Sequence, residues 1–274
     1  MKPLSSWPVG DRQRIKGIFT DIDDTLTTDG AITPDALAAL GELKTHGLSV
    51  IAITGRPAGW SAPFATDWPI DAIATENGAV LLQNNGQNSY RPIQIARKQL
   101  SKSYQISDVV RAENYARMQQ ISQRILHEVP GASLAQDSAG RETDMAIDHS
   151  EFTQLPPEKI AQVVAIMQGE GMTATVSSIH INGWFGAHNK LTGASWAVHK
   201  LFGRDLALEM SQWAFVGDST NDQLMFEAFS NSIGVANVRR FEVQLATLPR
   251  YVTEGERGAG FAEMAKAVLS AQAD

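Results

Sequence analysis

The sequence predicts an α/β fold: a doubly wound, Rossmann-like parallel sheet with a smaller α+β cap module inserted into it. Three observations lead to this prediction. Short, continuously apolar runs recur along the chain and are typical of strands that are covered on both faces. Amphipathic helical patterns follow these runs, which is the order found in parallel sheets. The stretch 87–186 breaks this alternation.

The strands and helices of the sheet region follow one another in order. Strands are expected at 17–21, 48–55, 212–218, 232–236 and 250–254. The first helix is expected at 33–47, where Thr33 can cap, Pro34 suits the first turn and Gly47 suits the C-terminal stop. Further helices are expected at 189–203, 219–229 and 258–273.

The middle of the chain predicts the inserted module. It follows a turn-prone stretch that contains Asn84, Asn85, Gly86 and Asn88. A helix at 107–129, strands near 132–136 and 143–148, a helix after Pro157 and an alternating run at 174–185 come next. We therefore expect a core from 1–86 and 187–274, with an α+β module at 87–186 between its two parts.

Composition excludes several classes of protein. The 274 residues are 43% hydrophobic and 19% charged, with a formal net charge of −7 and no cysteine. The acidic balance and the lack of a basic stripe argue against a nucleic-acid partner. Without cysteine there is no disulfide and no thiolate chemistry. No signal peptide or membrane-spanning run is recognisable, so we expect a cytoplasmic protein without a membrane partner. Its oligomeric state is not predicted.

Three aspartates crowd the end of the first expected strand. Asp21, Asp23 and Asp24 lie within four residues. One interpretation is a solvated acidic turn. The other is a cation site, in which one carboxylate is a covalent nucleophile and a second, two residues on, transfers protons. Carboxylate oxygens in this arrangement favour Mg²⁺.

Two further groups could bind phosphate. Thr54 and Gly55 follow the second expected strand, where a hydroxyl and backbone N–H groups can hold a phosphate oxygen, although an ordinary turn explains the same pair. Lys190 opens a helix, a position that the helix macrodipole disfavours for a cation. It could neutralise a phosphate, and an exposed surface lysine is the alternative.

The segment FVGDSTND carries the last group. Asp218 ends a strand, and Asn221 and Asp222 fall in the first turn of the next helix. These side chains could bind a hard metal ion, with helix capping as the alternative. Because ligands gather at the carboxyl ends of strands in open α/β sheets, the four groups are expected to meet there.

Taken in order, the four motifs resemble those of the haloacid dehalogenase superfamily of phosphotransferases. They are DIDDTLT (21–27), ITGR (53–56), Lys190 and GDSTND (217–222). A module inserted between the second and third motifs resembles the C2-capped branch. The segments ATENGAVLL (74–82) and SSIHIN (177–182) resemble subfamily IIB, which includes sucrose-phosphatase, mannosyl-3-phosphoglycerate phosphatase and phosphomannomutase.

The resemblance implies roles for the residues that match. Asp21 corresponds to the nucleophile and Asp23 to the general acid/base. Mg²⁺ would be bound by the Asp21 and Asp218 carboxylates and the Asp23 backbone carbonyl. Thr54 and Lys190 would hold the phosphate.

Supporting roles follow from the same resemblance. Asn221 and Asp222 would complete the site, either toward the metal through water or by orienting Lys190. Asp24 departs from the family, in which glycine or asparagine is frequent at this position. Its side chain is expected to face outward without a catalytic role.

The function implied is Mg²⁺-dependent hydrolysis of a small phosphate monoester, a sugar phosphate, through an aspartyl-phosphate intermediate. A phosphomutase of the same superfamily is one alternative. A non-hydrolytic phospho-acceptor or binding protein, of the receiver-domain kind, is another. His180, Asn182 and Trp184 are candidate substrate contacts in the cap, with packing or surface exposure as the alternative for each. Arg56, which follows Thr54 and Gly55, is a further candidate contact.

Overall fold

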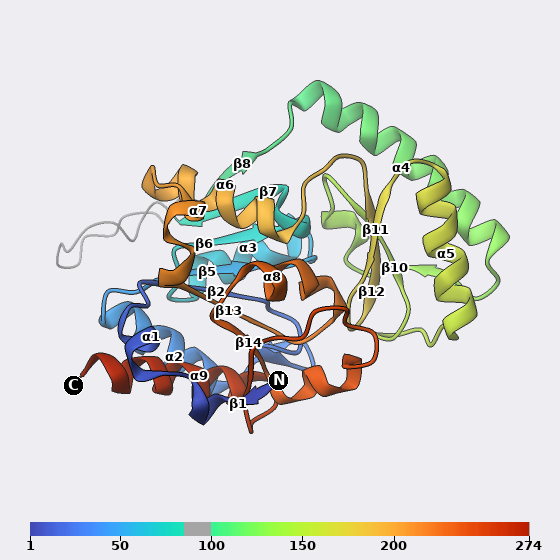
Figure 1. The fold of residues 1–274 in the computed structure, drawn as a ribbon. Helices are drawn as coiled ribbons and strands as arrows, with labels where there is room; N and C mark the ends of the chain where they lie inside the picture. Colours follow the sequence, from blue (N-terminus) through green and yellow to red (C-terminus); the bar gives the residue numbers. More distant parts are fainter. Residues whose placement is uncertain (85–99, 274) are drawn as a thin grey trace.

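A sheet of nine strands forms the centre of the molecule in the computed structural model, which describes residues 1–84 and 100–273 (Figure 1). The strand order is β1-β15-β14-β13-β2-β5-β6-β7-β8. Neighbouring strands are parallel from β1 to β6, whereas β7 pairs antiparallel with both β6 and β8.

The secondary-structure elements have the following bounds. The strands are β1 Lys2–Pro3, β2 Gly17–Thr20, β3 Thr27–Thr28, β4 Ala31–Ile32, β5 Ser49–Ile53, β6 Ala72–Thr75, β7 Val80–Asn84, β8 Leu100–Tyr104, β9 Ser133–Leu134, β10 Met145–Asp148, β11 Thr173–Val176, β12 His180–Trp184, β13 Trp213–Gly217, β14 Ser232–Gly234 and β15 Tyr251–Val252. The α-helices are α1 Val9–Gln13, α2 Pro34–Thr45, α3 Ala58–Asp67, α4 Asp108–Glu128, α5 Pro157–Gly169, α6 Lys190–Phe202, α7 Leu206–Glu209, α8 Gln223–Ala228 and α9 Arg257–Gln272.

Strand β2 lies where the winding of the sheet reverses. The chain passes from β2 to β5 and β6 on one side, and β13, β14 and β15 extend the sheet on the other. Thr20, the last residue of β2, pairs with Val216 of β13 and with Ala52 of β5. The carboxyl ends of these three strands are therefore side by side, at the position where open α/β sheets bind ligands.

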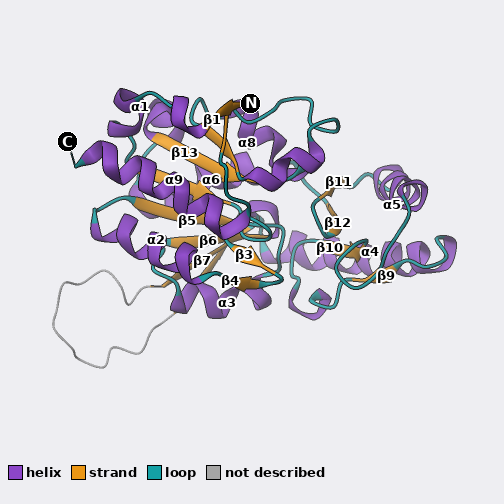
Figure 2. Cartoon of the chain, turned by 90° about the horizontal axis from the view of Figure 1, so that it is seen from below, coloured by secondary structure: helices purple, strands orange, loops and turns teal. Residues whose placement is uncertain are grey.

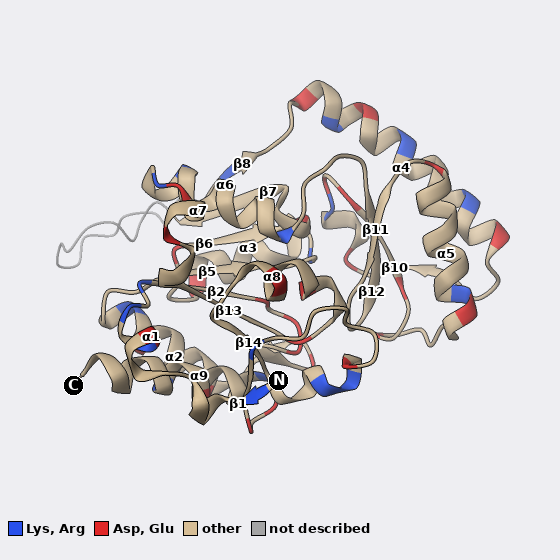
Figure 3. Cartoon of the chain, viewed as in Figure 1, with Lys and Arg blue, Asp and Glu red and all other residues tan. Residues whose placement is uncertain are grey.

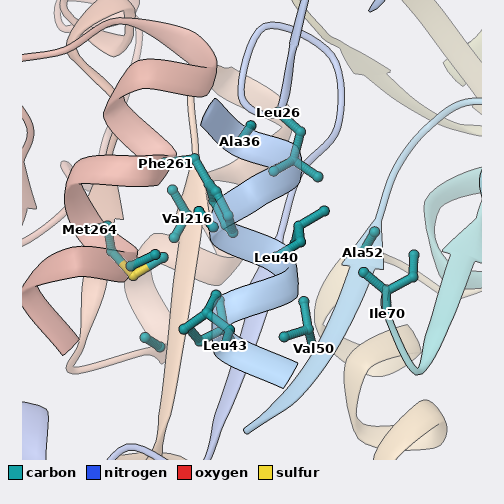
Figure 4. Packing of buried hydrophobic residues seen from close by; sticks show 14 of the residues in the cluster. Leu26, Ala36, Leu40, Leu43, Val50, Ala52, Ile70, Val216, Phe261 and Met264 are labelled. Atoms are coloured by element: carbon teal, nitrogen blue, oxygen red, sulfur yellow. The ribbon is translucent and has the colours of Figure 1, made fainter. Parts of the chain in front are cut away.

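Both faces of the sheet are covered by helices. Ile18 packs on one side, in a cluster with residues of α2, α3 and α9, and Phe19 packs on the other, with residues of α6 and α8. Figure 4 shows Leu40 and Leu43 of α2 beside Phe261 and Met264 of α9, over the sheet. Full burial of each large apolar side chain contributes roughly 1.5–3 kcal/mol, so the two layers fix the ends of the strands in place.

The inserted cap is a separate α+β layer beside the core (Figure 2). It contains an antiparallel sheet, in the order β11-β12-β10-β9, that packs against α4 and α5. Its own apolar cluster includes Met118, Ile125, Val163, Met167 and Ile181. Basic and acidic residues recur along α4, while the central strands of the core carry few charges (Figure 3).

The structure confirms the α/β class and the expected strands and helices of the core, and it differs in two places. The alternating run 174–185 is two strands, β11 and β12, joined by a turn at 177–179. Strand β8 lies inside the range 87–186 expected for the cap but pairs with β7 in the large sheet. The boundary at residue 87 and the turn residues Asn85, Gly86 and Asn88 lie outside the described residues, and the division 1–86, 87–186 and 187–274 stays a prediction.

Several short elements had no counterpart in the sequence prediction. They are β1, α1, β3, β4, α3, β6, β7, β8 and α7. Helix α3 contains Pro63 and begins in a Gly- and Trp-containing stretch, and β6 is only four residues long, so each gives a weak periodic signal. Within the described part of the chain, no helix is long and apolar enough to cross a membrane.

Helix α6 approaches the core through a contact between two glycine backbones. A Cβ atom on Gly193 would lie 2.5 Å from Cα of Gly78, a residue whose φ of +95° also favours glycine. Gly193→Ala is therefore expected to lower the free energy of unfolding by about 1–3 kcal/mol, although alanine is the better helix former. Urea denaturation measures this change.

Gly41 of α2 provides the matched control, because nothing lies within 4 Å of its Cβ position. Gly41→Ala is expected to raise the free energy of unfolding by about 0.5–1 kcal/mol. Stabilisation by both substitutions would contradict the close approach of α6.

Candidate active site

Asp21 and Lys190 meet at the carboxyl end of the central strand. Asp21 directly follows β2, and its N–H donates to the Val216 carbonyl at 2.9 Å, which ties it to β13. Lys190 is the first residue of α6. Its Nζ lies 2.5 Å from Asp21 Oδ1 and 2.7 Å from Asp222 Oδ1. All three side chains are buried, so Lys190 is not the exposed surface lysine considered as an alternative.

Asp222 holds both Lys190 and the loop after β13. While its Oδ1 accepts from Lys190, its Oδ2 accepts from the backbone N–H groups of Asp218 at 2.9 Å and Ser219 at 3.2 Å. A Cβ atom on Gly217 would clash with this carboxylate, which explains the glycine. Of the two arrangements expected for Asp222, these contacts are those of a residue that orients Lys190.

Asp218 faces Asp21 with one oxygen free. Asn237 donates to Asp218 Oδ2 at 3.2 Å, and Oδ1 is buried without a hydrogen-bond partner. Carboxylate oxygens of Asp21, Asp218 and Asp222 lie within 4.8 Å of one another. Asn237 was missed by sequence reasoning because it follows a different strand, β14, and no motif marks it.

The charges of this cluster do not balance. Burial raises the pKa of Asp21 to about 8 against the opposing effect of Lys190, and the negative charges of Asp222 and Asp23 raise it further. Burial also holds the pKa of Asp218 well above its ordinary value, assisted by Asp21 and Asp222. For Lys190, burial alone would lower the pKa, but the two carboxylates outweigh it and raise the pKa.

These residues fit a divalent metal ion. The unpartnered oxygen of Asp218 and an Asp21 oxygen are hard donors of the kind that Mg²⁺ prefers. A dication would also offset the surplus of negative charge. Asp222 is the less suitable ligand, since both of its oxygens already accept hydrogen bonds.

Asp23 is held by Arg56. The Arg56 Nε donates to Asp23 Oδ1 at 3.0 Å and to Oδ2 at 3.1 Å. The same guanidinium reaches two carboxylates of the cap, Glu151 at 2.7 Å and Asp137 at 3.1 Å. Arg56 therefore joins the candidate acid/base to the cap, and neither cap carboxylate was marked by the sequence.

Thr54 and Gly55 lie beside Asp21, below the cap. The hydroxyl of Thr54 accepts from the Arg56 N–H at 3.0 Å. The carbonyl of Gly55 accepts from Arg141 at 3.0 Å and from Asn182 at 3.3 Å, both residues of the cap. The segment expected to hold phosphate is thus also a point where the cap is anchored.

A small cavity encloses these groups. It is lined by the core residues Asp21, Asp23, Thr54, Gly55, Arg56, Ser219 and Asn221 and by the cap residues Ser177, Ser178, Ile179, His180 and Asn182. Its volume is about 10 Å³, room for about one water molecule. The turn between β11 and β12 covers the site, so the structure shows a closed arrangement of cap and core.

The remaining predicted residues fall near the site or away from it. His180 Nε2 contacts Glu151 Oε2 at 2.8 Å, and Asn221 accepts from the Ser219 hydroxyl at 2.9 Å. Trp184 is buried and its indole N–H donates to the His188 carbonyl, so it packs rather than faces the cavity.

Asp24 does not simply face outward. It is half-buried and forms an ion pair with Arg257 at 3.0 Å. Its φ of +55° lies in the left-handed region, where glycine, asparagine and aspartate are the residues best tolerated. The backbone, rather than catalysis, explains the residue type at this position.

Residues 18–254 match the family of haloacid dehalogenase-like hydrolases. The chain belongs to this family. A candidate phosphatase of Streptococcus pyogenes serotype M6 is 21% identical over 90% of this chain and 96% of its own. Two solved structures share the fold. A Thermoplasma acidophilum protein has a TM-score of 0.67 and 16% sequence identity, and the match covers 93% of this chain and 98% of that one. Sucrose-phosphatase from Synechocystis has a TM-score of 0.63 and 17% sequence identity, with the same coverage of the two chains.

The comparisons agree with the architecture described above. This haloacid dehalogenase-like hydrolase has the C2 type of cap, inserted between the second and third motifs, and it is a phosphatase of that family. The match extends from Ile18 in β2 to Glu254 after β15, and it includes the cap.

The surplus of negative charge at the site predicts opposite effects of two similar substitutions. In metal-free buffer containing EDTA at neutral pH, Asp218→Asn is expected to raise the free energy of unfolding by about 1 kcal/mol, because it removes a buried carboxylate with a raised pKa and a free oxygen. Urea denaturation of the variant and the parent measures the difference.

Asp222→Asn is the matched control. It is expected to lower the free energy of unfolding by about 3 kcal/mol, because Lys190 loses one of its two partners and two backbone N–H groups lose a charged acceptor. If both substitutions lowered the free energy of unfolding by similar amounts, the site would not carry the surplus of negative charge described above.

Proposed function

We propose that the chain is a Mg²⁺-dependent phosphatase that hydrolyses a small phosphorylated metabolite, a sugar phosphate, through an aspartyl phosphate on Asp21. One observation carries the proposal: the Asp21 carboxylate, buried at the end of β2, contacts Lys190 and lies within 4.8 Å of Asp218 and Asp222. The shared fold with sucrose-phosphatase, which was crystallised with sucrose and phosphate, supports a sugar ester as the substrate.

In the proposed first step, an oxygen of Asp21 attacks phosphorus and the bond to the leaving oxygen breaks. Lys190, the Thr54 hydroxyl and the backbone N–H groups that follow it would hold the phosphoryl oxygens. Mg²⁺, held by Asp21, Asp218 and the Asp23 carbonyl, would reduce the repulsion between the nucleophile and the phosphoryl group.

Asp23 would serve both steps. It would protonate the leaving oxygen while Asp21 attacks, and then take a proton from the water that hydrolyses the aspartyl phosphate. The product would be inorganic phosphate, and Asp21 would be regenerated. Closure of the cap would keep other water from the site during transfer.

Replacement of the nucleophile tests the proposal most directly. Asp21→Asn is expected to reduce phosphate release from any ester by at least roughly a thousandfold, because the amide cannot form the acyl phosphate. Release is measured with a panel of sugar phosphates in Mg²⁺ and again in EDTA, where the parent should also be inactive. Asp108→Asn, an exposed change on α4, is the control.

Near-parental rates for Asp21→Asn in Mg²⁺ would overturn the assignment of the nucleophile. Transfer of the phosphoryl group to a second sugar position, without release of inorganic phosphate, would support a mutase instead.

The two roles of Asp23 can be separated with an activated aryl ester. With 4-nitrophenyl phosphate the leaving group needs little protonation, whereas activation of water in the second step still needs a base. Asp23→Asn is therefore expected to release a burst of about one nitrophenolate per enzyme and then turn over roughly a hundredfold or more slowly than the parent. Stopped-flow absorbance measures both phases, and a slow first turnover without a burst would contradict a role confined to proton transfer.

A further inference from the structure

A second cavity opens on the other side of Asp23. Its volume is about 330 Å³, and it lies between the hairpin β3–β4, the cap loop at 150–152 and the start of α9. Asp23, Arg56 and Ile179 line both this cavity and the closed one around Asp21. We refer to the second cavity, lined also by Asp24, Asp29, Glu151, Phe152 and Arg257, as the outer cavity.

The outer cavity has the room for a leaving group that the closed cavity lacks. The general acid must reach the leaving oxygen, so an ester bound at Asp21 extends past Asp23. The closed cavity has room for about one water molecule, whereas the outer cavity is within the size range of ligand pockets. This step rests on the function proposed above.

Acidic groups dominate the outer cavity. Four carboxylates line it, those of Asp23, Asp24, Asp29 and Glu151, against two guanidinium groups. The formal charge of its lining is therefore −2. Such a surface repels an anion and offers acceptors to hydroxyl or ammonium groups.

Both arginines of the outer cavity are already engaged. Arg56 is 5% exposed and is shared among Asp23, Asp137 and Glu151. Arg257 pairs with Asp24 at 3.0 Å and lies 3.8 Å from Asp29. These are the two cationic residues among the described residues that line the cavity. Because both already pair with carboxylates, neither can pair with a second anionic group of a substrate.

Arg257 is also fixed by its backbone. Its φ of +52° lies in the left-handed region, and its N–H donates to Asn237 Oδ1 at 2.9 Å. Asn237 in turn donates to Asp218 and to the Asp24 carbonyl. The pair Asp24–Arg257 is thus held in position by Asn237, and the positive charge of Arg257 is neutralised by Asp24.

We propose that the outer cavity selects phosphate esters whose leaving group is a neutral or cationic polyhydroxylated compound, and rejects esters that carry a second anionic group. Its carboxylates accept hydrogen bonds from hydroxyl groups, and the exposed ring of Phe152 offers an apolar face to a carbon skeleton. A sugar or polyol phosphate meets these conditions, whereas a phosphorylated sugar acid does not.

Matched substrates test the inference in the intact enzyme with Mg²⁺. Sorbitol 6-phosphate and 6-phosphogluconate have the same carbon chain and differ in a terminal hydroxymethyl or carboxylate. We expect kcat/KM for 6-phosphogluconate to be lower by at least roughly tenfold, because like charges face each other in the complex. The kcat/KM for glucosamine 6-phosphate should equal or exceed that for glucose 6-phosphate.

A substitution at Asp29 tests whether the cavity charge causes the selectivity. Asn tolerates the φ of +51° at this position, and the Asp29 side chain is 89% exposed, so Asp29→Asn should fold. It is expected to raise kcat/KM for 6-phosphogluconate relative to sorbitol 6-phosphate by roughly threefold. Glu113→Gln, the same charge change on the exposed surface of α4, should leave the ratio unchanged.

Acetyl phosphate tests the proposed phosphatase function separately from the selectivity of the outer cavity, because its leaving group is too small to fill that cavity. Asp21-dependent hydrolysis of acetyl phosphate, together with equal or faster use of 6-phosphogluconate than sorbitol 6-phosphate, would overturn the inference and leave the proposed function standing. Hydrolysis of acetyl phosphate without use of any sugar or polyol ester would overturn the inference and, with it, the assignment of a sugar phosphate as the substrate, while the phosphatase activity itself would stand. If no ester is hydrolysed in an Asp21-dependent way, the proposed function fails and the inference with it.

Discussion

One buried lysine faces three buried carboxylates, and much of the structure serves to hold this arrangement together. Lys190, the first residue of α6, contacts both Asp21 and Asp222. Asp218 lies next to them, and one of its carboxylate oxygens has no hydrogen-bond partner. Like charges this close raise the free energy of the fold unless a cation joins them. The apolar layers on both faces of the sheet offset that cost, and the remaining surplus of negative charge is one that a divalent cation would neutralise.

The geometry of the sheet brings these groups together. Asp21 and Asp218 follow β2 and β13, adjacent parallel strands, and so lie at the same edge where the winding reverses. Lys190 depends on tertiary contact instead. Its helix comes close enough because Gly78 and Gly193 allow two backbones to touch. A strand register and one glycine contact therefore set distances that catalysis needs to within a fraction of an ångström.

The sequence predicts those parts of the molecule that have local patterns. Continuous apolar runs that end in Asp21, Thr54 and Asp218 mark the central strands and place polar groups at their ends. Contacts between distant segments leave no such mark: Arg56 with Asp137 and Glu151, and Asn237 with Asp218, join residues from separate elements. The run 174–185 alternates in the same way whether it is one strand or a hairpin, so the turn that covers the site could not be located.

The contacts between cap and core differ in kind from those inside each. Both interiors are apolar, whereas the cap meets the catalytic edge through polar groups: Arg56 with Glu151 and Asp137, Arg141 with the Gly55 carbonyl, and buried Glu76 with the Thr143 hydroxyl. When two surfaces separate, water replaces polar contacts at a small net cost in free energy. Exposure of apolar surfaces to water has a large cost in free energy. Because Gly55 and Arg56 contact the cap and directly follow Thr54 of the proposed phosphate site, closure of the cap would also complete that site. An enzyme whose closed site has room for about one water molecule must open to admit an ester, and a polar interface is the kind that allows it.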